Sequence, residues 1–135
     1  MVIAKKRPRR RVSRRAKTGE YISTKTGKKC KYRSGWEAKY MEFLDNDPDV
    51  VDWEYESITI PYVSNKKTGR IRKYTPDMYV VRSKGRKELI EVKPINKLDK
   101  ITVIKKAEAA KRWCEAFDVE YKFITEIDLK ELGLL

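Results

Sequence analysis

The chain has 135 residues, 40% of them hydrophobic, which is enough for one domain with its own core but too few for two domains of ordinary size. It has no run of about 18 apolar residues and no histidine, which excludes a membrane-spanning helix, histidine bases, Ser-His-Asp catalysis and the usual Cys/His zinc sites. The net charge is +13, and all of it lies in residues 1–33, which hold 14 Lys/Arg and one acid, whereas residues 34–135 hold 19 of each sign.

Residues 1–33 are predicted to form a basic, largely flexible arm that binds nucleic acid. Up to Gly19 the segment is poor in apolar residues and is interrupted by Pro8, so it cannot bury enough surface to offset its ordering entropy. A run this rich in arginine typically follows phosphates, and we favour this role over a solubility, localisation or protein-docking tail. Residues 20–33 are expected to add a short β-ribbon. The candidate nucleic-acid-binding residues of the arm are Lys5, Lys6, Arg7, Arg9, Arg10, Arg11, Arg14 and Arg15.

The two cysteines and the N-terminal sequence indicate the cellular compartment in which the protein works. Cys30 and Cys114 lie far apart and form no CxxC pair, so we expect free thiols rather than a disulfide framework. The N-terminus is rich in arginine but lacks the apolar stretch of a secretory signal. We therefore expect a soluble, intracellular protein with no contact to a membrane.

Residues 34–47 predict the first helix of the chain. Ser34 suits the N-cap position, and Glu37, three residues later, suits the acidic partner in a capping box. On a helical wheel Glu37 also falls between Met41 and Leu44, within the apolar face. A capping side chain does not need to point at the core, so we interpret Glu37 as an inward carboxylate that requires a partner.

Residues 50–63 alternate as in a β-strand, and the parity of the alternation changes near Glu56. This change predicts a β-bulge. The apolar side chains expected to point inward before the bulge are Val51, Trp53 and Tyr55. The outward positions carry three acids, which we interpret as a solvated strand face rather than a metal cluster: Asp52, Glu54 and Glu56.

Two further strands are predicted at 71–81 and 87–93, joined by the loop RSKGR. An amphipathic helix at 98–118 follows, then a strand at 119–125 and a terminal helix ended by Gly133. We predict an α/β fold with a mixed central β-sheet, an antiparallel meander plus a later parallel strand, flanked by helices. The side chains of the long helix expected to point inward are Leu98, Ile101, Ile104, Ala107, Ala110, Cys114 and Phe117.

The loop between the two central strands decides which side chains meet across them. If residues 83–85 form a three-residue loop with its glycine left-handed, Asp77 falls directly opposite Glu91. Opposed side chains share a face, with β-carbons about 5 Å apart, and Lys93 lies one step along that face. A two- or four-residue loop would place Asp77 opposite Val92 instead.

Two carboxylates held together in a mostly apolar sheet repel each other unless a cation lies between them. Oxygen ligands without histidine or cysteine favour Mg²⁺ or Mn²⁺ over zinc. Lys93 is placed to activate or orient an attacking water. The alternative for Glu91 and Lys93 is a surface ion pair worth about 0–1 kcal/mol, but the Pro-Asp pair, the inward glutamate and the basic arm together favour catalysis. The candidate metal ligands are Asp77, Glu91, the Val92 backbone carbonyl and, for a second metal or through a water, Glu37.

These residues carry a resemblance to a known family. Pro76-Asp77 followed by Glu91-Val92-Lys93, with Glu37 on the preceding helix, resembles the PD-(D/E)XK nuclease superfamily. More narrowly, the segments YRSGWEAKYMEFLD, WEYESITIPYV, YTPDMYV and LIEVKP, in this order, are similar to the TnsA-like endonucleases, especially the small head-completion nucleases of large tailed phages. The similarity covers about residues 30–130.

The resemblance implies a restriction-endonuclease-like core in residues 34–135 and a Mg²⁺-dependent DNA endonuclease in which water attacks the phosphodiester directly. It also implies a role in phage head completion or DNA-end processing, in the host cytoplasm or associated with the virion. Little in the sequence indicates base-specific recognition, so we expect low sequence specificity. Lys97 and Lys100 are further candidates for DNA contact. The catalytic residues it implies are Glu37, Asp77, Glu91 and Lys93.

Two other interpretations remain open at this point. One is a DNA-binding structural protein of the virion that has lost the reaction, although the complete set of four catalytic residues argues against it. The other is a basic RNA-binding protein of ribosomal type, which would leave the carboxylate pair without a purpose. The expected partners are DNA and phage head or packaging proteins, and a homodimer would suit double-strand cleavage.

Overall fold

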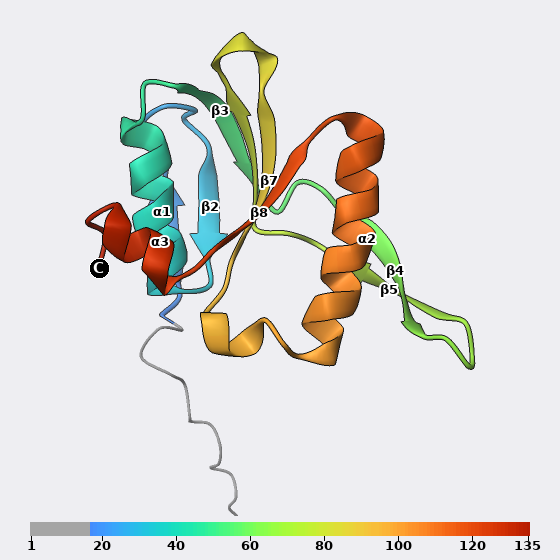
Figure 1. Cartoon of the computed structure of the whole chain (residues 1–135). Coiled ribbons are helices and arrows are strands. Elements are labelled where there is room, and N and C mark those ends of the chain that lie inside the picture. Colours follow the sequence, from blue (N-terminus) through green and yellow to red (C-terminus); the bar gives the residue numbers. More distant parts are fainter. Residues whose placement is uncertain (1–16) are drawn as a thin grey trace, which may run out of the picture.

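The computed structural model describes residues 17–135, so the arm candidates from Lys5 to Arg15 lie outside the described range. The main elements are β3 (Val50–Tyr55), β6 (Met78–Arg82), β7 (Lys87–Val92), β8 (Glu120–Ile124), α1 (Gly35–Asn46), α2 (Ile101–Phe117) and α3 (Glu126–Glu131). A four-stranded sheet in the order β3-β6-β7-β8 forms the centre, with β8 parallel to β7 and the other pairs antiparallel. Helices α1 and α2 lie on opposite sides of it (Figure 1), which confirms the predicted mixed α/β fold.

The alternation of side chains along the central strands gives each helix its own half of the core. Val80 and Ile90 pack in one cluster with Leu44 of α1. Leu89, the neighbour of Ile90 in sequence, packs in the other cluster with Ala110 of α2. Because successive side chains of a strand point to opposite faces, odd-numbered positions of β7 face α2 and even-numbered positions face α1.

Two β-hairpins lie outside the central sheet. The first joins β1 (Gly19–Ile22) to β2 (Lys29–Tyr32), which confirms the ribbon predicted within the N-terminal segment, and its partly buried side chains pack on the α1 half of the core. The second joins β4 (Ile60–Asn65) to β5 (Arg70–Tyr74) and packs against α2. Figure 1 shows the second hairpin projecting from the body of the molecule. A short 3₁₀ turn is formed by Ile95–Lys97, and residues Ser83–Gly85 form the loop between β6 and β7.

Each of the two long strands predicted before the central loop is divided in the structure. The predicted strand 50–63 separates into β3 and β4, because Glu56 adopts a left-handed φ of 51° that turns the chain out of the central sheet. The predicted strand 71–81 separates into β5 and β6 around Pro76, whose nitrogen cannot donate to a ladder. These two breaks allow β4 and β5 to form a hairpin of their own.

The parity change near Glu56 therefore marks a strand break, and the β-bulge predicted there is wrong. The irregularity in β3 lies instead between Val50 and Asp52. It turns Val50 inward, 2% exposed, and leaves Val51 60% exposed, so the inward orientation predicted for Val51 is also wrong. Trp53 is buried as predicted.

Helix α2 packs through its small residues. Ala107, Ala110 and Cys114 are buried as predicted, and Ala110 and Cys114 pack in one cluster with Ile60 and Tyr62 of β4. The inward orientation predicted for Ile101, Ile104 and Phe117 is wrong: all three are exposed, while Val103 and Ala109 are buried. The helix begins only at Ile101, after the preceding 3₁₀ turn, so Leu98 precedes it.

The predicted N-cap of α1 and the predicted end of α3 are confirmed, but the predicted capping box is only half formed, because the Glu37 side chain accepts the Arg33 N–H instead of the Ser34 N–H. The Ser34 hydroxyl oxygen accepts a hydrogen bond from the Glu37 backbone N–H at 3.1 Å at the start of α1. Gly133, with φ 74°, ends α3, and the next residue, Leu134, donates its N–H to the Leu129 carbonyl as in a Schellman motif. No helix among residues 17–135 is long and apolar enough to cross a membrane.

Candidate active site

The hairpin β6–β7 brings Asp77 and Glu91 together. The Arg82 N–H donates to the Arg86 carbonyl at 2.7 Å, which closes a three-residue loop, and the ladder continues to the pair Met78–Ile90. The next opposed position pairs Asp77 with Glu91, so the register predicted for the three-residue loop is confirmed. The loop has two left-handed residues rather than the single expected glycine, because Lys84 (φ 65°) precedes Gly85 (φ 76°) in that conformation.

Asp77 and Glu91 are both buried, 7% and 8% exposed, on the sheet face that α2 covers. One oxygen of Asp77, Oδ2, accepts the Val92 N–H at 2.7 Å. Burial raises the pKa of Asp77 well above its usual range, and the charges of Glu91 and then Glu37 raise it further. Within residues 17–135 no donor reaches the other oxygen, Oδ1, which leaves it free to bind a cation.

Glu91 has a lysine on one side and a tyrosine on the other. Lys93 Nζ lies 3.4 Å from Oε2, and the Tyr74 hydroxyl donates to Oε1 at 3.0 Å. Burial raises the pKa of Glu91, and the Lys93 charge and Tyr74 hydrogen bond only partly oppose this. The Tyr74 hydroxyl also lies 2.9 Å from that of Tyr121, and Lys106 Nζ lies 5.6 Å from the centre of the Tyr74 ring.

Tyr74 is a site residue that the sequence did not reveal. Burial and the neighbouring Glu91 carboxylate raise its pKa, so its hydroxyl keeps its proton and acts as a donor. In the sequence Tyr74 is one of eight tyrosines and has the pattern of a core residue. Only its distance from Asp77, three residues, linked it to the site.

Glu37 lies near the pair but has partners of its own. It is 6% exposed, and its Oε1 accepts both the Tyr55 hydroxyl at 2.7 Å and the Arg33 N–H at 3.0 Å. Its charge contributes to the raised pKa of both Asp77 and Glu91. Among residues 17–135, no three Asp, Glu, His or Cys side chains are grouped closely enough to hold one ion. This geometry favours Glu37 acting through a water over direct binding to a metal that Asp77 and Glu91 share.

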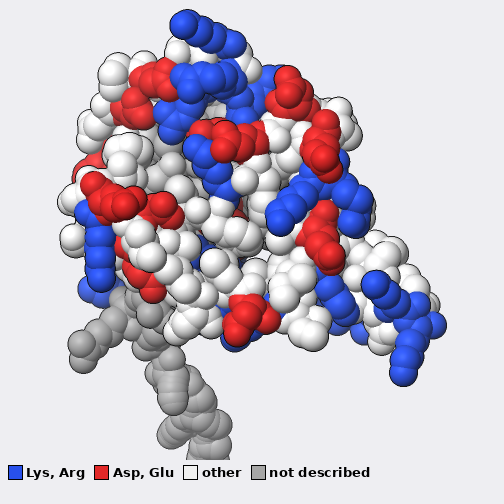
Figure 2. All heavy atoms as spheres, viewed as in Figure 1, with Lys and Arg blue, Asp and Glu red and all other residues white. Residues whose placement is uncertain are grey.

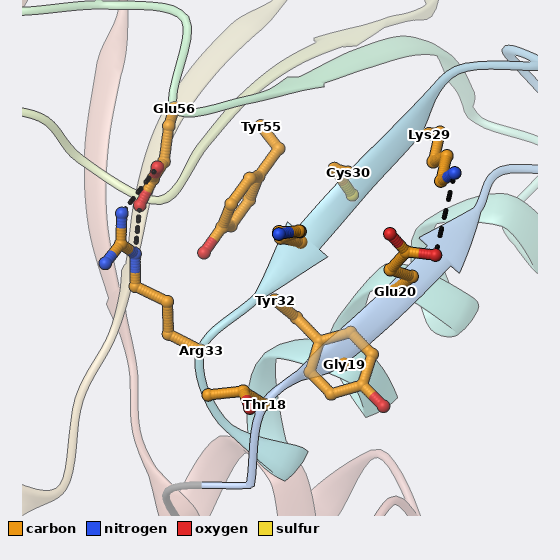
Figure 3. Close-up of a pocket in the computed structure, with 10 residues that line it drawn as sticks. Thr18, Gly19, Glu20, Lys29, Cys30, Tyr32, Arg33, Tyr55 and Glu56 are labelled. Atoms are coloured by element: carbon orange, nitrogen blue, oxygen red, sulfur yellow. Dashed lines mark hydrogen bonds and ion pairs between the residues drawn. The ribbon is translucent and has the colours of Figure 1, made fainter.

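A hollow of about 730 Å³ opens on the Glu37 side of the site. Figure 3 shows its lining from the first hairpin and from the end of β3, with Tyr55 between Cys30 and the Arg33–Glu56 ion pair. The Arg33 guanidinium lies 2.9 Å from Glu56, and Arg33 and Tyr55 also contact Glu37. The hollow therefore adjoins Glu37 through these two residues, while Asp77 and Glu91 do not line it.

The two remaining candidates lie beyond the end of β7. Lys97 is in the 3₁₀ turn Ile95–Lys97 and Lys100 is the N-cap residue of α2, and both are exposed. Neither forms an ion pair with a residue in the part of the chain that the structure describes. Their contact with DNA remains a prediction.

The donors at the site fit a hard divalent cation. Two buried carboxylates with raised pKa values regain their charged form most easily when a cation lies between them, and carboxylate oxygens are preferred ligands of Mg²⁺. With only two carboxylates grouped, Mg²⁺ would keep several waters, which is its usual behaviour in proteins.

Comparison with known proteins identifies the family of the chain. Residues 47–126 match the family described as TnsA-like endonuclease N terminal, a span that contains Asp77, Glu91 and Lys93. The "Head completion nuclease" of Enterobacteria phage T4 is 30% identical over 128 aligned residues, which cover 78% of this chain and 85% of that protein. The chain belongs to the TnsA-like endonuclease family.

Proposed function

We propose that this protein is a metal-dependent DNA endonuclease of low sequence specificity. The observation that carries the proposal is the buried pair Asp77 and Glu91, opposed across one hairpin, with Lys93 beside it. A sheet that only had to be stable would not hold two carboxylates against each other. Family membership supports the endonuclease activity.

The proposed roles follow from the contacts. Asp77 and Glu91, with the Val92 carbonyl, would hold Mg²⁺ or Mn²⁺, which when bound would supply positive charge against the phosphate. Tyr74 fixes the orientation of Glu91 through its hydroxyl. Glu37 positions a water at the edge of the site.

Lys93 orients the attacking water. The water oxygen forms a bond to phosphorus while the bond from phosphorus to one ester oxygen breaks, so no covalent enzyme intermediate arises. The water gives up a proton to solvent, and the leaving oxygen gains one. The Lys93 ammonium stabilises the negative charge that grows on the phosphate oxygens.

The biological setting is proposed from the relative. Because that protein is called a head completion nuclease, we place this chain at the completion of a phage head, on the ends of packaged DNA, with head or packaging proteins as partners. The arm, residues 1–33, supplies affinity that is independent of sequence, and residues 34–135 carry the reaction. Action in the host cytoplasm, association with the virion and a homodimer belong to the same proposal.

A cleavage assay tests the activity. Supercoiled, linear and branched DNA are incubated with the protein in Mg²⁺, in Mn²⁺ or in EDTA. We expect cleavage only with metal, and a loss of about 10³-fold or more in Lys93→Ala and Glu91→Gln, because each change removes a group that acts at the reacting phosphate.

Lys87→Ala is the matched control, since Lys87 lies on the same strand and the same face but is exposed at the far end. It should cleave like the wild type. Unchanged cleavage in Lys93→Ala or Glu91→Gln would disprove the site. If the wild type cuts none of the substrates, a non-catalytic DNA-binding protein of the virion becomes the better interpretation.

A further inference from the structure

The hairpin β4–β5 carries a concentration of unpaired positive charge next to the site. From Ser57 to Pro76 the chain contains no Asp or Glu, and the five cations of this segment are all exposed. None of the five side chains forms an ion pair or a hydrogen bond with any residue between 17 and 135. They are Lys66, Lys67, Arg70, Arg72 and Lys73.

Several cations elsewhere in the described residues have acidic partners, which the hairpin segment cannot supply because it contains no acid. Arg82 pairs with Asp47, Asp49 and Glu88, and Lys122 pairs with Glu88. Figure 2 shows the contrast: at the lower right, where Figure 1 places the tip of the hairpin, the side chains are basic or uncharged, whereas both charges mix over the rest of this face. The hairpin therefore presents a basic surface, free of acidic side chains, to which an external anion can bind.

The base of the hairpin is fixed to the body and leads directly into the site. Ile60, Tyr62 and Tyr74 pack against the small residues of α2, and Lys105 Nζ donates to the Ser64 carbonyl at 2.7 Å. Tyr74, the last residue of β5, donates to Glu91, and Asp77 follows three residues later. A ligand that lay along the hairpin would be directed to the carboxylate pair.

The dimensions of the hairpin suit duplex DNA. At about 3.3 Å per residue, β5 reaches about 13 Å from Tyr74 to Arg70, which matches the rise of roughly four base pairs at about 3.4 Å each. A two-stranded β-ribbon also fits the major groove, which is about 12 Å wide.

The hairpin lacks what a single-strand site needs. Proteins that bind single strands offer exposed aromatic rings on which bases stack. The two aromatic residues of this segment, Tyr62 and Tyr74, are buried against α2. The outer face instead exposes the cross-strand pair Val63 and Ile71, 42% and 58% exposed, which offers apolar contact but no stacking surface.

We infer that the hairpin β4–β5 is a docking element for double-stranded DNA, which holds the duplex by its phosphates and guides one strand to Asp77 and Glu91. This inference deepens the proposed function and rests on it for the choice of DNA. It assigns affinity for duplex to the folded domain as well as to the arm.

The test is a binding measurement in EDTA, where cleavage cannot occur. A labelled duplex of about 20 base pairs and the matching single strand are titrated at about 50 to 200 mM salt, with fluorescence anisotropy as the readout. One variant replaces all five hairpin cations by Gln. The control variant makes the same change in net charge at exposed cations elsewhere: Lys84, Lys87, Lys111, Arg112 and Lys130.

We expect the hairpin variant to bind duplex at least about tenfold more weakly than the control. The slope of log K against log salt should fall by about 0.9 for each phosphate that the variant no longer neutralises, so by about 3 or more in total. Binding of the single strand should change much less. Circular dichroism checks the fold, and the double variant Lys66→Gln/Lys67→Gln, confined to the turn, should by itself lower the slope by more than about 1 if the larger variant does not fold.

Equal duplex binding by the hairpin and control variants would overturn the inference, and the hairpin would then face a protein partner. Equal losses for duplex and single strand would overturn the choice of duplex. These outcomes are separate from the cleavage assay: cutting by the wild type with no hairpin effect rejects only the inference, and a hairpin effect without cutting rejects only the proposed reaction.

Discussion

Strand β7 carries two buried glutamates, Glu88 and Glu91, in opposite electrostatic surroundings. Glu88 faces α1 and accepts hydrogen bonds from Arg82 at 2.9 Å and from Lys122 at 2.6 Å. Burial alone would raise its pKa, but these two cations outweigh burial and lower it. Glu91 faces α2 and Asp77, and its pKa is raised.

This difference in surroundings indicates two roles: Glu88 stabilises the fold, and Glu91 acts in the proposed reaction. Glu88 has its charges balanced within the chain, and this pairing secures β6 and β8 on either side of β7. The Asp77–Glu91 pair has one lysine, beside Glu91, for two carboxylates, so its charge is not balanced by the described residues. A buried site that lacks balance is stable only with an external cation or with bound protons.

Exchanging each glutamate for glutamine gives the sharpest test of this division. Glu91→Gln should lose about 10³-fold or more in cleavage yet unfold at equal or higher urea concentration, because it relieves repulsion with Asp77. Glu88→Gln should keep cleavage within about threefold but lose about 2–3 kcal/mol of unfolding free energy, because Arg82 and Lys122 lose their shared partner.

The measurements are cleavage rate and urea unfolding in EDTA, on both variants and the wild type. Loss of stability in Glu91→Gln together with loss of activity in Glu88→Gln would contradict the division. The comparison uses the same substitution on the same strand, so a general effect of removing one carboxylate cancels.

The two glutamates also show how far the sequence predicts the site. The period of two along β7 and the three-residue loop are local, so the pairing of Asp77 with Glu91 follows from the sequence. The partners of Glu88 and Glu91 are mostly not local, because Lys122 and Tyr74 reach them from β8 and β5. Neither contact has a pattern in the sequence, since it depends on how separate strands are placed.

The division of the predicted strands has the same cause. A left-handed Glu56 is unusual for a residue other than glycine, and nothing in the alternation of side chains distinguishes it from a bulge. Residues 64–70, between the two predicted strands, contain the tip of the hairpin β4–β5, but the sequence does not show that both strands leave the central sheet. The structure was needed to show that separation.

Bound metal should stabilise the folded protein only where the Asp77–Glu91 pair is intact. Mg²⁺ or Mn²⁺ that binds only the folded protein at about 100 times its dissociation constant should add about 2.7 kcal/mol to the unfolding free energy of the wild type. Glu91→Gln and Asp77→Asn should show little of this gain. Glu88→Gln should respond as the wild type does, because it lies on the other face of the sheet. Thermal unfolding with and without metal measures the shift, and an equal gain in all three variants would place the metal elsewhere.

The smallest effect is in the pH dependence of stability, measured in EDTA. The lowered pKa of Glu88 means that the unfolded chain binds more protons at this residue than the folded protein does. The stability that Glu88 contributes is therefore present above about pH 4.3 and is lost as pH falls through the folded pKa.

The raised pKa of Asp77 has the opposite effect on stability, because the folded state binds more protons at Asp77, and stability falls as pH rises above about 4. Asp77→Asn removes this decline, so its stability relative to wild type should increase as pH rises above about 4, by about 1.4 kcal/mol for each pKa unit relieved. Glu88→Gln should show the reverse, with a deficit relative to wild type that shrinks as pH falls below about 4. Urea unfolding across this pH range measures both effects. If the difference in unfolding free energy between Asp77→Asn and wild type were the same at every pH, Asp77 would ionise in the folded protein as it does in the unfolded chain, and the carboxylate pair would need no cation.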